Sequence, residues 1–343
     1  MKIVIATPLY PPEIAEPAPY VKELAERLSG EHEIIIVAYA STSEKIKDTK
    51  LITIDKRRPL FIRLIKYLIE IFKASRNADV IYIQNSLAVG LPAIIAGFLQ
   101  KVPVAIRFTE DEAWKRAVYA RLTKKKLNEF LDEPDIGNLK IRLIMRAQGF
   151  ILRQAQTVIV PSEYLRDALI KAYHLQNKKI IVNCNPAKKE VILPFSAVKI
   201  PRQIVAITDK KNKINKIINA VSLLKKEFPD IQLIAAEQES TRAEMWHLYK
   251  TSQVCILNST EEFSETAIDC FNAGIPVVFT GAPDASEKNI ADAILKLLKD
   301  HDLRERLVKD GQKTIAEKFS WDVHSHALLK TFFRISLAIK SQL

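Results

Sequence analysis

Residues Leu257 to Thr280 form the most informative segment of the chain, LNSTEEFSETAIDCFNAGIPVVFT. An apolar run is followed by a polar loop, a helical pattern, a glycine and a second β-branched run. Ser264 is suited to cap the helix, and Gly274 followed by Pro276 is typical of a helix end. The segment therefore predicts a strand, a helix and a second strand, which is the repeating unit of an α/β domain.

The same alternation extends over the rest of the chain. Continuous apolar runs, which are typical of strands buried on both faces, alternate with helical patterns almost throughout. We expect strands at Lys2–Thr7, Glu33–Tyr39, Leu51–Ile54, Val80–Ile83, Val104–Phe108, Thr157–Val160, Ile180–Asn183, Ile204–Ile207, Ile231–Ala236, Val254–Leu257 and Val277–Thr280. This order predicts doubly wound parallel sheets with right-handed crossovers.

Length indicates two domains. The chain has 343 residues, more than one hydrophobic core usually serves. A stretch containing Pro and Lys, residues 185–203, is typical of a linker. We expect a Rossmann-like domain over residues 1–190, a smaller one over 203–320, and a closing helix over 321–343 that packs back on the first domain.

Composition excludes several classes of protein. With 48% hydrophobic and 27% charged residues, the chain is neither disordered nor fibrous. No apolar run reaches the roughly 20 residues that span a bilayer, and the start lacks the layout of a secretory signal. The three cysteines, Cys184, Cys255 and Cys270, are too scattered for a disulfide framework or a metal site. We therefore expect a cytoplasmic protein without a bound metal.

The segment 257–280 resembles the signature of the family 4 retaining glycosyltransferases, which have the GT-B fold. That signature pairs two acidic residues eight positions apart around E-x-F-[GS], here Glu261 and Asp269, and ends in A-G-x-P-V-V. Similar segments follow in the family's order along nearly the whole chain: Tyr10–Pro12, Tyr20–Leu28, Ala78–Gln84, Asp111–Trp114, Val158–Leu169 and Leu303–Trp321. The resemblance implies two Rossmann-like domains that face a cleft.

On the donor side, the resemblance assigns roles to individual residues. Glu261 would contact the donor sugar, while Phe263 and Ser264 would offer backbone N–H groups to sugar or phosphate. Asp269, where the family has Glu, would hold the ribose hydroxyls. Lys211 or Lys213 could replace the family's diphosphate-binding Arg and Lys; the alternative is a solvated, Lys-rich helix start.

On the acceptor side, the resemblance implies that Asp111 orients the acceptor hydroxyl. A loop after the first strand would cover the diphosphate and acceptor, and it would include Tyr10, Pro11, Pro12, Ala15 and Glu16.

The implied activity is transfer of a sugar, with retention, from a UDP- or GDP-linked donor to a lipid-linked or cell-surface glycan. The leaving phosphate would serve as the base, so a pair of carboxylates like that of a glycosidase is not required. Apart from the donor substrate, the resemblance implies no cofactor. No motif for binding nucleic acid is present, and the basic residues are interleaved with aliphatic rather than aromatic ones.

The chain has only eight glycines, although about 7% is usual. The family usually has glycines where this chain has Ala15, Glu16 and Glu110, and the carboxylate of Glu16 would oppose a diphosphate. A second hypothesis therefore stands beside the enzyme: a catalytically degenerate GT-B scaffold that acts as a binding or assembly partner.

The formal charge of +12 is concentrated partly in KRRPLFIRLIKYLIEIFKASR, residues 56–76. Apolar residues recur there at helical spacing, and basic ones accompany them. One interpretation is a helix on an anionic membrane surface at the inner membrane face, with Arg57, Arg58, Arg63 and Lys66 toward the lipid. The other is a crossover helix packed on the first sheet with a basic exposed face.

Overall fold

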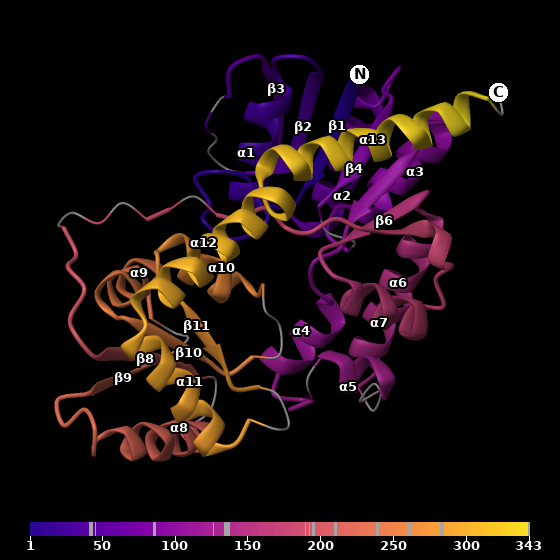
Figure 1. Cartoon of the computed structure of the whole chain (residues 1–343). Coiled ribbons are helices and arrows are strands. Elements are labelled where there is room, and N and C mark those ends of the chain that lie inside the picture. Colours follow the sequence, from indigo (N-terminus) through magenta and orange to yellow (C-terminus); the bar gives the residue numbers. More distant parts are fainter. Residues whose placement is uncertain are drawn as a thin grey trace. The chain divides into compact units, whose positions relative to one another are not determined.

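The computed structural model divides the chain into two compact units, each built on a parallel sheet (Figure 1). Unit 1 comprises Met1–Asn185 and His324–Leu343, and unit 2 comprises Pro186–Val323. The structure describes residues 1–341 except 41–43, 45, 85–86, 126, 134–137, 189, 192, 194–195, 209–210, 238–239, 260–262 and 282–284. For residues 128, 208, 211–213 and 237 it describes the backbone only.

Among the residues described, the sheet of unit 1 has seven strands in the order β3-β2-β1-β4-β5-β6-β7, with all neighbours parallel. They are β1 (Lys2–Thr7), β2 (Glu33–Tyr39), β3 (Thr49–Ile54), β4 (Val80–Ile83), β5 (Val104–Arg107), β6 (Thr157–Val160) and β7 (Ile180–Val182). The strand order reverses between β1 and β4. In doubly wound sheets, ligands bind beyond the carboxyl ends of the strands at such a reversal.

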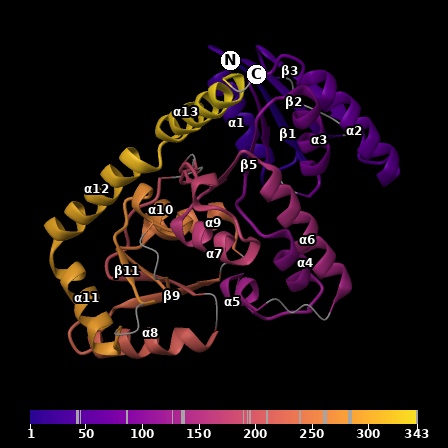
Figure 2. The same cartoon turned by 90° about the vertical axis from the view of Figure 1, so that its right-hand side faces the viewer.

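Helices cover both faces of this sheet (Figure 2). They are α1 (Ala18–Leu28), α2 (Leu60–Ala74), α3 (Gly90–Gln100), α4 (Glu112–Tyr119), α5 (Leu127–Asp132), α6 (Leu139–Gln154), α7 (Glu163–Tyr173) and α13 (Trp321–Lys340). Successive side chains of β4 point to opposite faces of the sheet. Ile81 and Ile83 lie in the core with α2 and α3, whereas Tyr82 contacts Tyr20 of α1 and Phe332 of α13.

Unit 2 is smaller, and within its described part the sheet has four parallel strands in the order β11-β10-β8-β9. The strands are β8 (Gln203–Thr208), β9 (Gln232–Glu237), β10 (Val254–Leu257) and β11 (Val277–Phe279). The helices are α8 (Lys211–Leu224), α9 (Arg242–Thr251), α10 (Glu265–Asn272), α11 (Glu287–Lys299) and α12 (His301–Lys318). Apolar cores lie on both faces of the sheet, one with α9, α10 and α12 and one with α8 and α11. Every expected strand is present, with ends that move by at most two residues.

The last helix, α13, completes unit 1. Leu328 and Phe332 are fully buried, and the Phe332 ring lies 5.0 Å from the ring of Tyr82. Near the end of α13, Lys340 Nζ donates to Asp79 Oδ1 at 2.7 Å. No described helix is both long and apolar enough to cross a membrane.

Two of the few glycines lie where elements approach each other closely. A Cβ on Gly97 in α3 would be 2.5 Å from Val104 Cγ2, and one on Gly311 in α12 would be 2.6 Å from the Phe271 ring. Because real Cβ atoms essentially never come so close, a larger residue would force the neighbours apart. These two glycines therefore allow α3 to pack closely on β5 and α12 to pack closely on α10.

Candidate functional site

Helix α10 begins close after the carboxyl end of β10, and two residues fix its start. The Ser264 hydroxyl accepts a hydrogen bond from the backbone N–H of Ala267 at 3.4 Å. The Phe263 ring packs inward beside Phe271 and Phe319, with centroids 6.0 and 5.5 Å apart. The start of α10 is thus held at the carboxyl edge of the sheet, and the N–H groups at the start of a helix favour anions.

Asp269 lies on α10 with its side chain only 10% exposed, and it is paired with Arg242 at the start of α9. Arg242 Nε donates to Oδ2 at 3.0 Å and Nη2 donates to Oδ1 at 2.8 Å. These charge-assisted bonds raise the pKa of Arg242. A ribose at Asp269 would compete with the guanidinium or share the carboxylate with it.

The remaining donor-side residues stay predictions. Glu261 lies outside the described residues. Lys211 and Lys213 begin α8, where only the backbone is described. Because β8 and β10 are neighbouring parallel strands, the helices that follow them, α8 and α10, start at the same edge of the sheet.

The loop after β1 is anchored at one end and exposed at the other. Tyr10 is fully buried, and burial raises its pKa to about 12. The Tyr10 hydroxyl has no hydrogen-bond partner within the described chain. Pro11 is buried too, whereas Pro12, Ala15 and Glu16 are exposed. The exposed end of this loop reaches the carboxyl end of β5.

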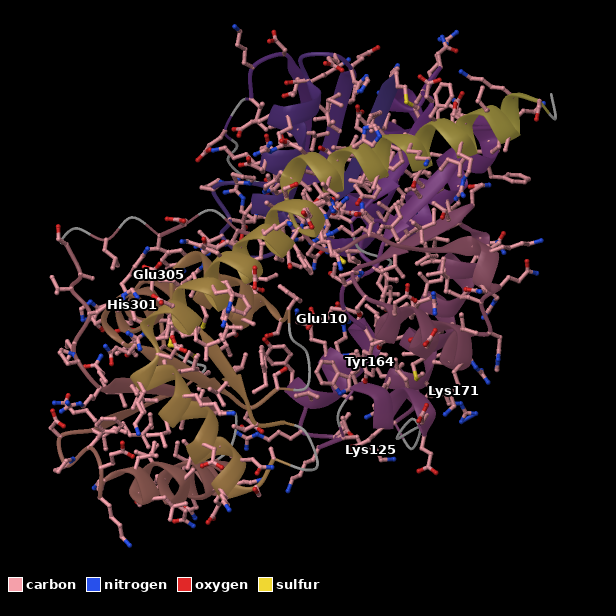
Figure 3. The ribbon with its side chains drawn as sticks, viewed as in Figure 1. Glu110, Lys125, Tyr164, Lys171, His301 and Glu305 are labelled. Atoms are coloured by element: carbon pink, nitrogen blue, oxygen red, sulfur yellow. The ribbon has the colours of Figure 1, made fainter. Side chains whose placement is uncertain are left out.

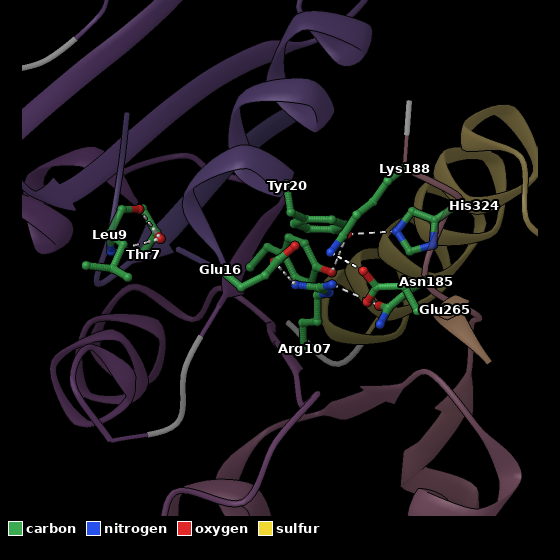
Figure 4. Close-up of polar contacts among 10 residues, drawn as sticks. Thr7, Leu9, Glu16, Tyr20, Arg107, Asn185, Lys188, Glu265 and His324 are labelled. Atoms are coloured by element: carbon green, nitrogen blue, oxygen red, sulfur yellow. Dashed lines mark hydrogen bonds and ion pairs between the residues drawn. The ribbon is translucent and has the colours of Figure 1, made fainter. Parts of the chain in front are cut away.

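There Glu16 contacts Arg107, the last residue of β5 (Figure 4). Glu16 Oε2 accepts from Arg107 Nη1 at 3.5 Å, and Asn185 Oδ1 accepts from Nη2 at 2.8 Å. The guanidinium carbon lies 3.6 Å from the centroid of the Tyr20 ring, which is a cation–π contact. Arg107 is only 7% exposed, so a charged group is enclosed at this edge of the sheet.

The Tyr20 hydroxyl extends this network to α13. It lies 3.0 Å from the Tyr82 hydroxyl and 2.7 Å from His324 Nε2. His324 Nδ1 lies 2.8 Å from the carbonyl oxygen of Cys184, which can only accept, so Nδ1 carries the proton and Nε2 accepts from Tyr20. Burial lowers the pKa of His324 to about 4, which keeps the imidazole neutral at pH 7.

Asp111 is fully buried, in contrast to the acceptor-facing position expected from the sequence. Its Oδ1 accepts from the backbone N–H of Trp114 at 2.8 Å and caps α4. Its Oδ2 accepts from Gln148 Nε2 at 2.7 Å and from the Tyr173 hydroxyl. Burial raises the pKa of Asp111, and these hydrogen bonds oppose the rise. The carboxylate therefore joins α4, α6 and α7 rather than presenting an oxygen to a ligand.

The four basic residues of the helix at 56–76 do not share one environment. Arg57, Arg58 and Lys66 are exposed. Arg63 instead turns toward the sheet, in contrast to the expected lipid-facing position: its guanidinium lies 5.0 Å from the Tyr39 ring and donates to the Lys56 carbonyl at 3.1 Å. Its contacts hold α2 to the sheet.

Apolar side chains are exposed on α2 and on α3, which pack side by side (Figure 2). Phe61 is 74% exposed and Phe98 is 82% exposed. We call the group the α2–α3 surface; it consists of Leu60, Phe61, Ile62, Ile65, Ile69, Phe72, Leu91, Ile95, Phe98 and Leu99.

Figure 3 labels further ionisable side chains, among them Glu110 in unit 1 and His301 and Glu305 in unit 2. Glu110 pairs with Lys115 at 2.6 Å. His301 and Glu305 of α12 help to line a cavity of about 390 Å³ in unit 2, whose other lining residues are Lys199, Gln253, Gly274, Pro276, Arg304, Val308, Lys309 and Gln312. Gln253 and Pro276 precede β10 and β11, so this cavity opens at the edge of the sheet opposite to the start of α10. No three metal-binding side chains gather anywhere in the part of the chain that the structure describes.

A sequence model of a protein family identifies the chain. The model of Glycosyltransferase Family 4 matches residues 18–190, just over half of its length. The chain belongs to glycosyltransferase family 4. No curated protein sequence matches it.

Solved structures resemble this family 4 glycosyltransferase over nearly its whole length. Alr3699/HepE of Anabaena, in complex with UDP, has a TM-score of 0.61 at 14% identity, with 97% of this chain and 100% of that chain covered. A glycosyltransferase from Rickettsia africae ESF-5 has a TM-score of 0.59 at 14% sequence identity, with 97% of this chain and 98% of that chain covered. The lipopolysaccharide outer core galactosyltransferase WaaB, in its apo form, has a TM-score of 0.54 at 13% sequence identity, with 100% of both chains covered. The likeness confirms the expected GT-B fold.

Two arginines of this glycosyltransferase were missed by sequence reasoning. Arg107 is the one charge in the apolar run Val104–Phe108, and a charge at the carboxyl end of a buried strand is a usable signal. Arg242 follows Thr241, which forms a capping box with Glu244, so the helix start could have been predicted. The pairing of Arg242 with Asp269 could not have been predicted, because nothing in the sequence between them indicates the contact.

Proposed function

We propose that this glycosyltransferase transfers a sugar, with retention, from a UDP- or GDP-linked donor to a lipid-linked or cell-surface glycan. The observation that carries the proposal is the start of α10. It is capped by Ser264, anchored by Phe263, follows Glu261 in the sequence and lies at the carboxyl edge of the sheet of unit 2. Backbone N–H groups held in this way suit the sugar and phosphate oxygens of a donor.

The reaction needs mainly positioning and charge stabilisation. The acceptor hydroxyl would attack the anomeric carbon from the face that the diphosphate leaves, and the departing phosphate oxygen would take the hydroxyl proton. One C–O bond forms and one breaks, and the protein supplies no covalent intermediate. Lys211 and Lys213, with the start of α10, would stabilise the charge that develops on the leaving diphosphate.

Two solved relatives support a UDP-linked donor and a cell-surface acceptor. HepE has been crystallised with UDP, with UDP and glucose, and with UDP-glucose. WaaB is a galactosyltransferase of the lipopolysaccharide outer core. We carry these substrate classes to the present chain as part of the proposal.

The acceptor, in this proposal, is reached at an anionic membrane on its cytoplasmic side. The α2–α3 surface includes the exposed Phe61 and Phe98. Of the exposed basic residues, Lys66 lies on α2 and Arg58 lies just before it. A lipid surface matches both features, because it accepts aromatic side chains and attracts each nearby basic residue by about 1 kcal/mol.

A second candidate, a scaffold without turnover, rests on the Asp269–Arg242 pair. Both carboxylate oxygens are already engaged where the family resemblance implies contact with the ribose. Arg242 would then close the donor site permanently, and unit 2 would serve as a framework for a partner protein.

Titration calorimetry of the purified chain with UDP, GDP and a panel of their sugars separates the two candidates. The enzyme is expected to bind at least one of them at millimolar concentration or better, and Glu261→Ala is expected to abolish binding of the sugar-linked form. Glu227→Ala, at an exposed residue of unit 2 that pairs with Lys299, serves as the matched control. If no nucleotide in the panel binds, the scaffold is the correct function.

A further inference from the structure

The carboxyl edge of the sheet in unit 1 contains a charged group to which the transfer reaction gives no role. Arg107 is only 7% exposed, and its Nε has no hydrogen-bond partner among the residues that the structure describes. Its countercharge is Glu16, whose side chain is 52% exposed and whose nearest approach is 3.5 Å. An enclosed cation with unused donor capacity is thus paired weakly with a carboxylate on a surface loop.

The orientation of the guanidinium does not depend on Glu16. The Tyr20 ring supports it at 3.6 Å, and Asn185 accepts from Nη2 at 2.8 Å. Tyr20 is itself held by hydrogen bonds to Tyr82 and His324. Removal of Glu16 would therefore leave a fixed guanidinium, and a guanidinium with free N–H groups suits phosphate oxygens.

We propose that Arg107 binds a phosphate group of the ligand and that Glu16 is an internal carboxylate that occupies this position until the phosphate displaces it. The proposal rests on the proposed function for the nature of the ligand, which would be either the diphosphate of the donor or a phosphorylated acceptor. Glu16 then weakens binding of the anion, because a competing internal contact must break first.

The same loop contains a matched control. Glu13 forms an ion pair with Lys56, away from Arg107. Glu13→Gln and Glu16→Gln change the charge of the loop equally, but only the second releases Arg107. Both glutamates are exposed, so neither substitution disturbs a packed core.

The first experiment measures binding of inorganic diphosphate by calorimetry to the full chain and to these two variants. Because Glu16 is half exposed and approaches Arg107 only to 3.5 Å, we expect their contact to be weak. Glu16→Gln is therefore expected to raise the affinity about threefold to fivefold, and Glu13→Gln is expected to leave it unchanged. Affinity that is unchanged or lower in Glu16→Gln, or an equal rise in both variants, overturns the proposal.

Substitution of the arginine tests the same assignment from the other side. In a Glu16→Gln background, Arg107→Gln is expected to remove the gain in affinity, with the fold checked by circular dichroism. If the double variant does not fold, the comparison of Glu16→Gln with Glu13→Gln still tests whether Arg107 binds the anion. A folded double variant that retains the gain overturns the proposal.

UDP and octyl phosphate then distinguish the two sources of the phosphate. A rise in UDP affinity on Glu16→Gln assigns the anion to the donor, and a rise for octyl phosphate assigns it to the acceptor. Either rise supports the site. A gain for diphosphate in a protein without transfer activity would support the anion site and reject the proposed function, whereas unchanged binding in an active enzyme would reject the anion site alone.

Discussion

Asp269 and Arg242 form two parallel hydrogen bonds, at 3.0 and 2.8 Å, that join α10 to α9 across 27 residues of sequence. The pair has two consequences. It neutralises a carboxylate that is nearly enclosed in unit 2, and it sets a cation beside the position that the family resemblance assigns to the ribose. In the proposed function, a ribose that binds Asp269 therefore competes with this pair.

Arg242→Gln is expected to raise the affinity for UDP about threefold to tenfold, because the ribose no longer competes with the guanidinium for Asp269. Calorimetry with UDP measures the change. Arg202→Gln removes another ion pair of unit 2, with Asp230 at 2.5 Å, and is expected to have no effect. A drop in UDP affinity on Arg242→Gln would mean that the guanidinium contacts the nucleotide itself.

Asp111→Ala is expected to lower the free energy of unfolding by ~3 kcal/mol, since it removes the cap of α4 and leaves Gln148 and Tyr173 without their buried acceptor. Urea denaturation provides the measurement. In the neighbouring Glu112→Ala, only an ion pair with Arg116 at 2.8 Å is lost, and the expected change is ~0.5 kcal/mol or less. If Asp111→Ala lost transfer activity but kept full stability, Asp111 would have the acceptor-side role that the family resemblance implies.

His324 is expected to make the protein less stable as the pH falls. Its pKa is about 4 in the folded chain, against an ordinary value of 6.5. Between these values the unfolded chain takes up a proton that the folded chain does not, so the free energy of unfolding drops with decreasing pH, by up to ~3 kcal/mol at pH 4. Thermal unfolding between pH 7 and pH 4.5 follows this change.

His324→Gln is expected to flatten that pH dependence, while His326→Gln, at an exposed residue of the same helix, leaves it intact. An identical slope for the wild type and His324→Gln would show that other groups cause the loss.

The α2–α3 surface is expected to bind vesicles that contain anionic lipid. The double variant Phe61→Ser/Phe98→Ser removes the two most exposed aromatic side chains of this surface and is expected to reduce cosedimentation at least tenfold. Phe333→Ser, at an exposed position of α13, is the control. Equal losses in both would indicate nonspecific adsorption.

Charge reversal tests the basic part of the same surface. Arg58→Glu/Lys66→Glu is expected to weaken cosedimentation and to reduce its dependence on salt, since both side chains are exposed. Binding that persists unchanged in this variant would exclude the basic residues from the contact.

The fold was largely predictable from sequence because its strands are short, β-branched and buried on both faces. The run Glu33–Tyr39, for example, has the same bounds in the structure. The helix Gly90–Gln100 was not singled out, because it is apolar on nearly all sides and has no clear period. Its exposed Phe98 and its closely packed Gly97 depend on the neighbouring α2 and β5 and could not be derived from its own sequence.

The start of α10 was predictable from the sequence, but the side-chain contacts of the candidate site residues were not. Ser264 caps its helix as expected. In contrast, the burial of Asp111 depends on Gln148 and Tyr173, which are 37 and 62 residues away. Pairwise contacts at such distances leave no trace in the spacing of a single sequence, and the same holds for Arg63 beneath Tyr39 and for Arg107 beside Glu16.

The position of α13 also determines the order in which the protein can fold during synthesis. Unit 1 combines residues 1–185 with α13, which follows unit 2 in the sequence, and Leu328 and Phe332 of α13 are fully buried in it. While the ribosome is still adding these residues, Tyr20 and Tyr82 lack their cover, whereas residues 186–323 have already been made. Residues 1–185 therefore mature after unit 2 has been made, and a chain without residues 324–343 would expose the apolar surface that α13 covers to chaperones and proteases.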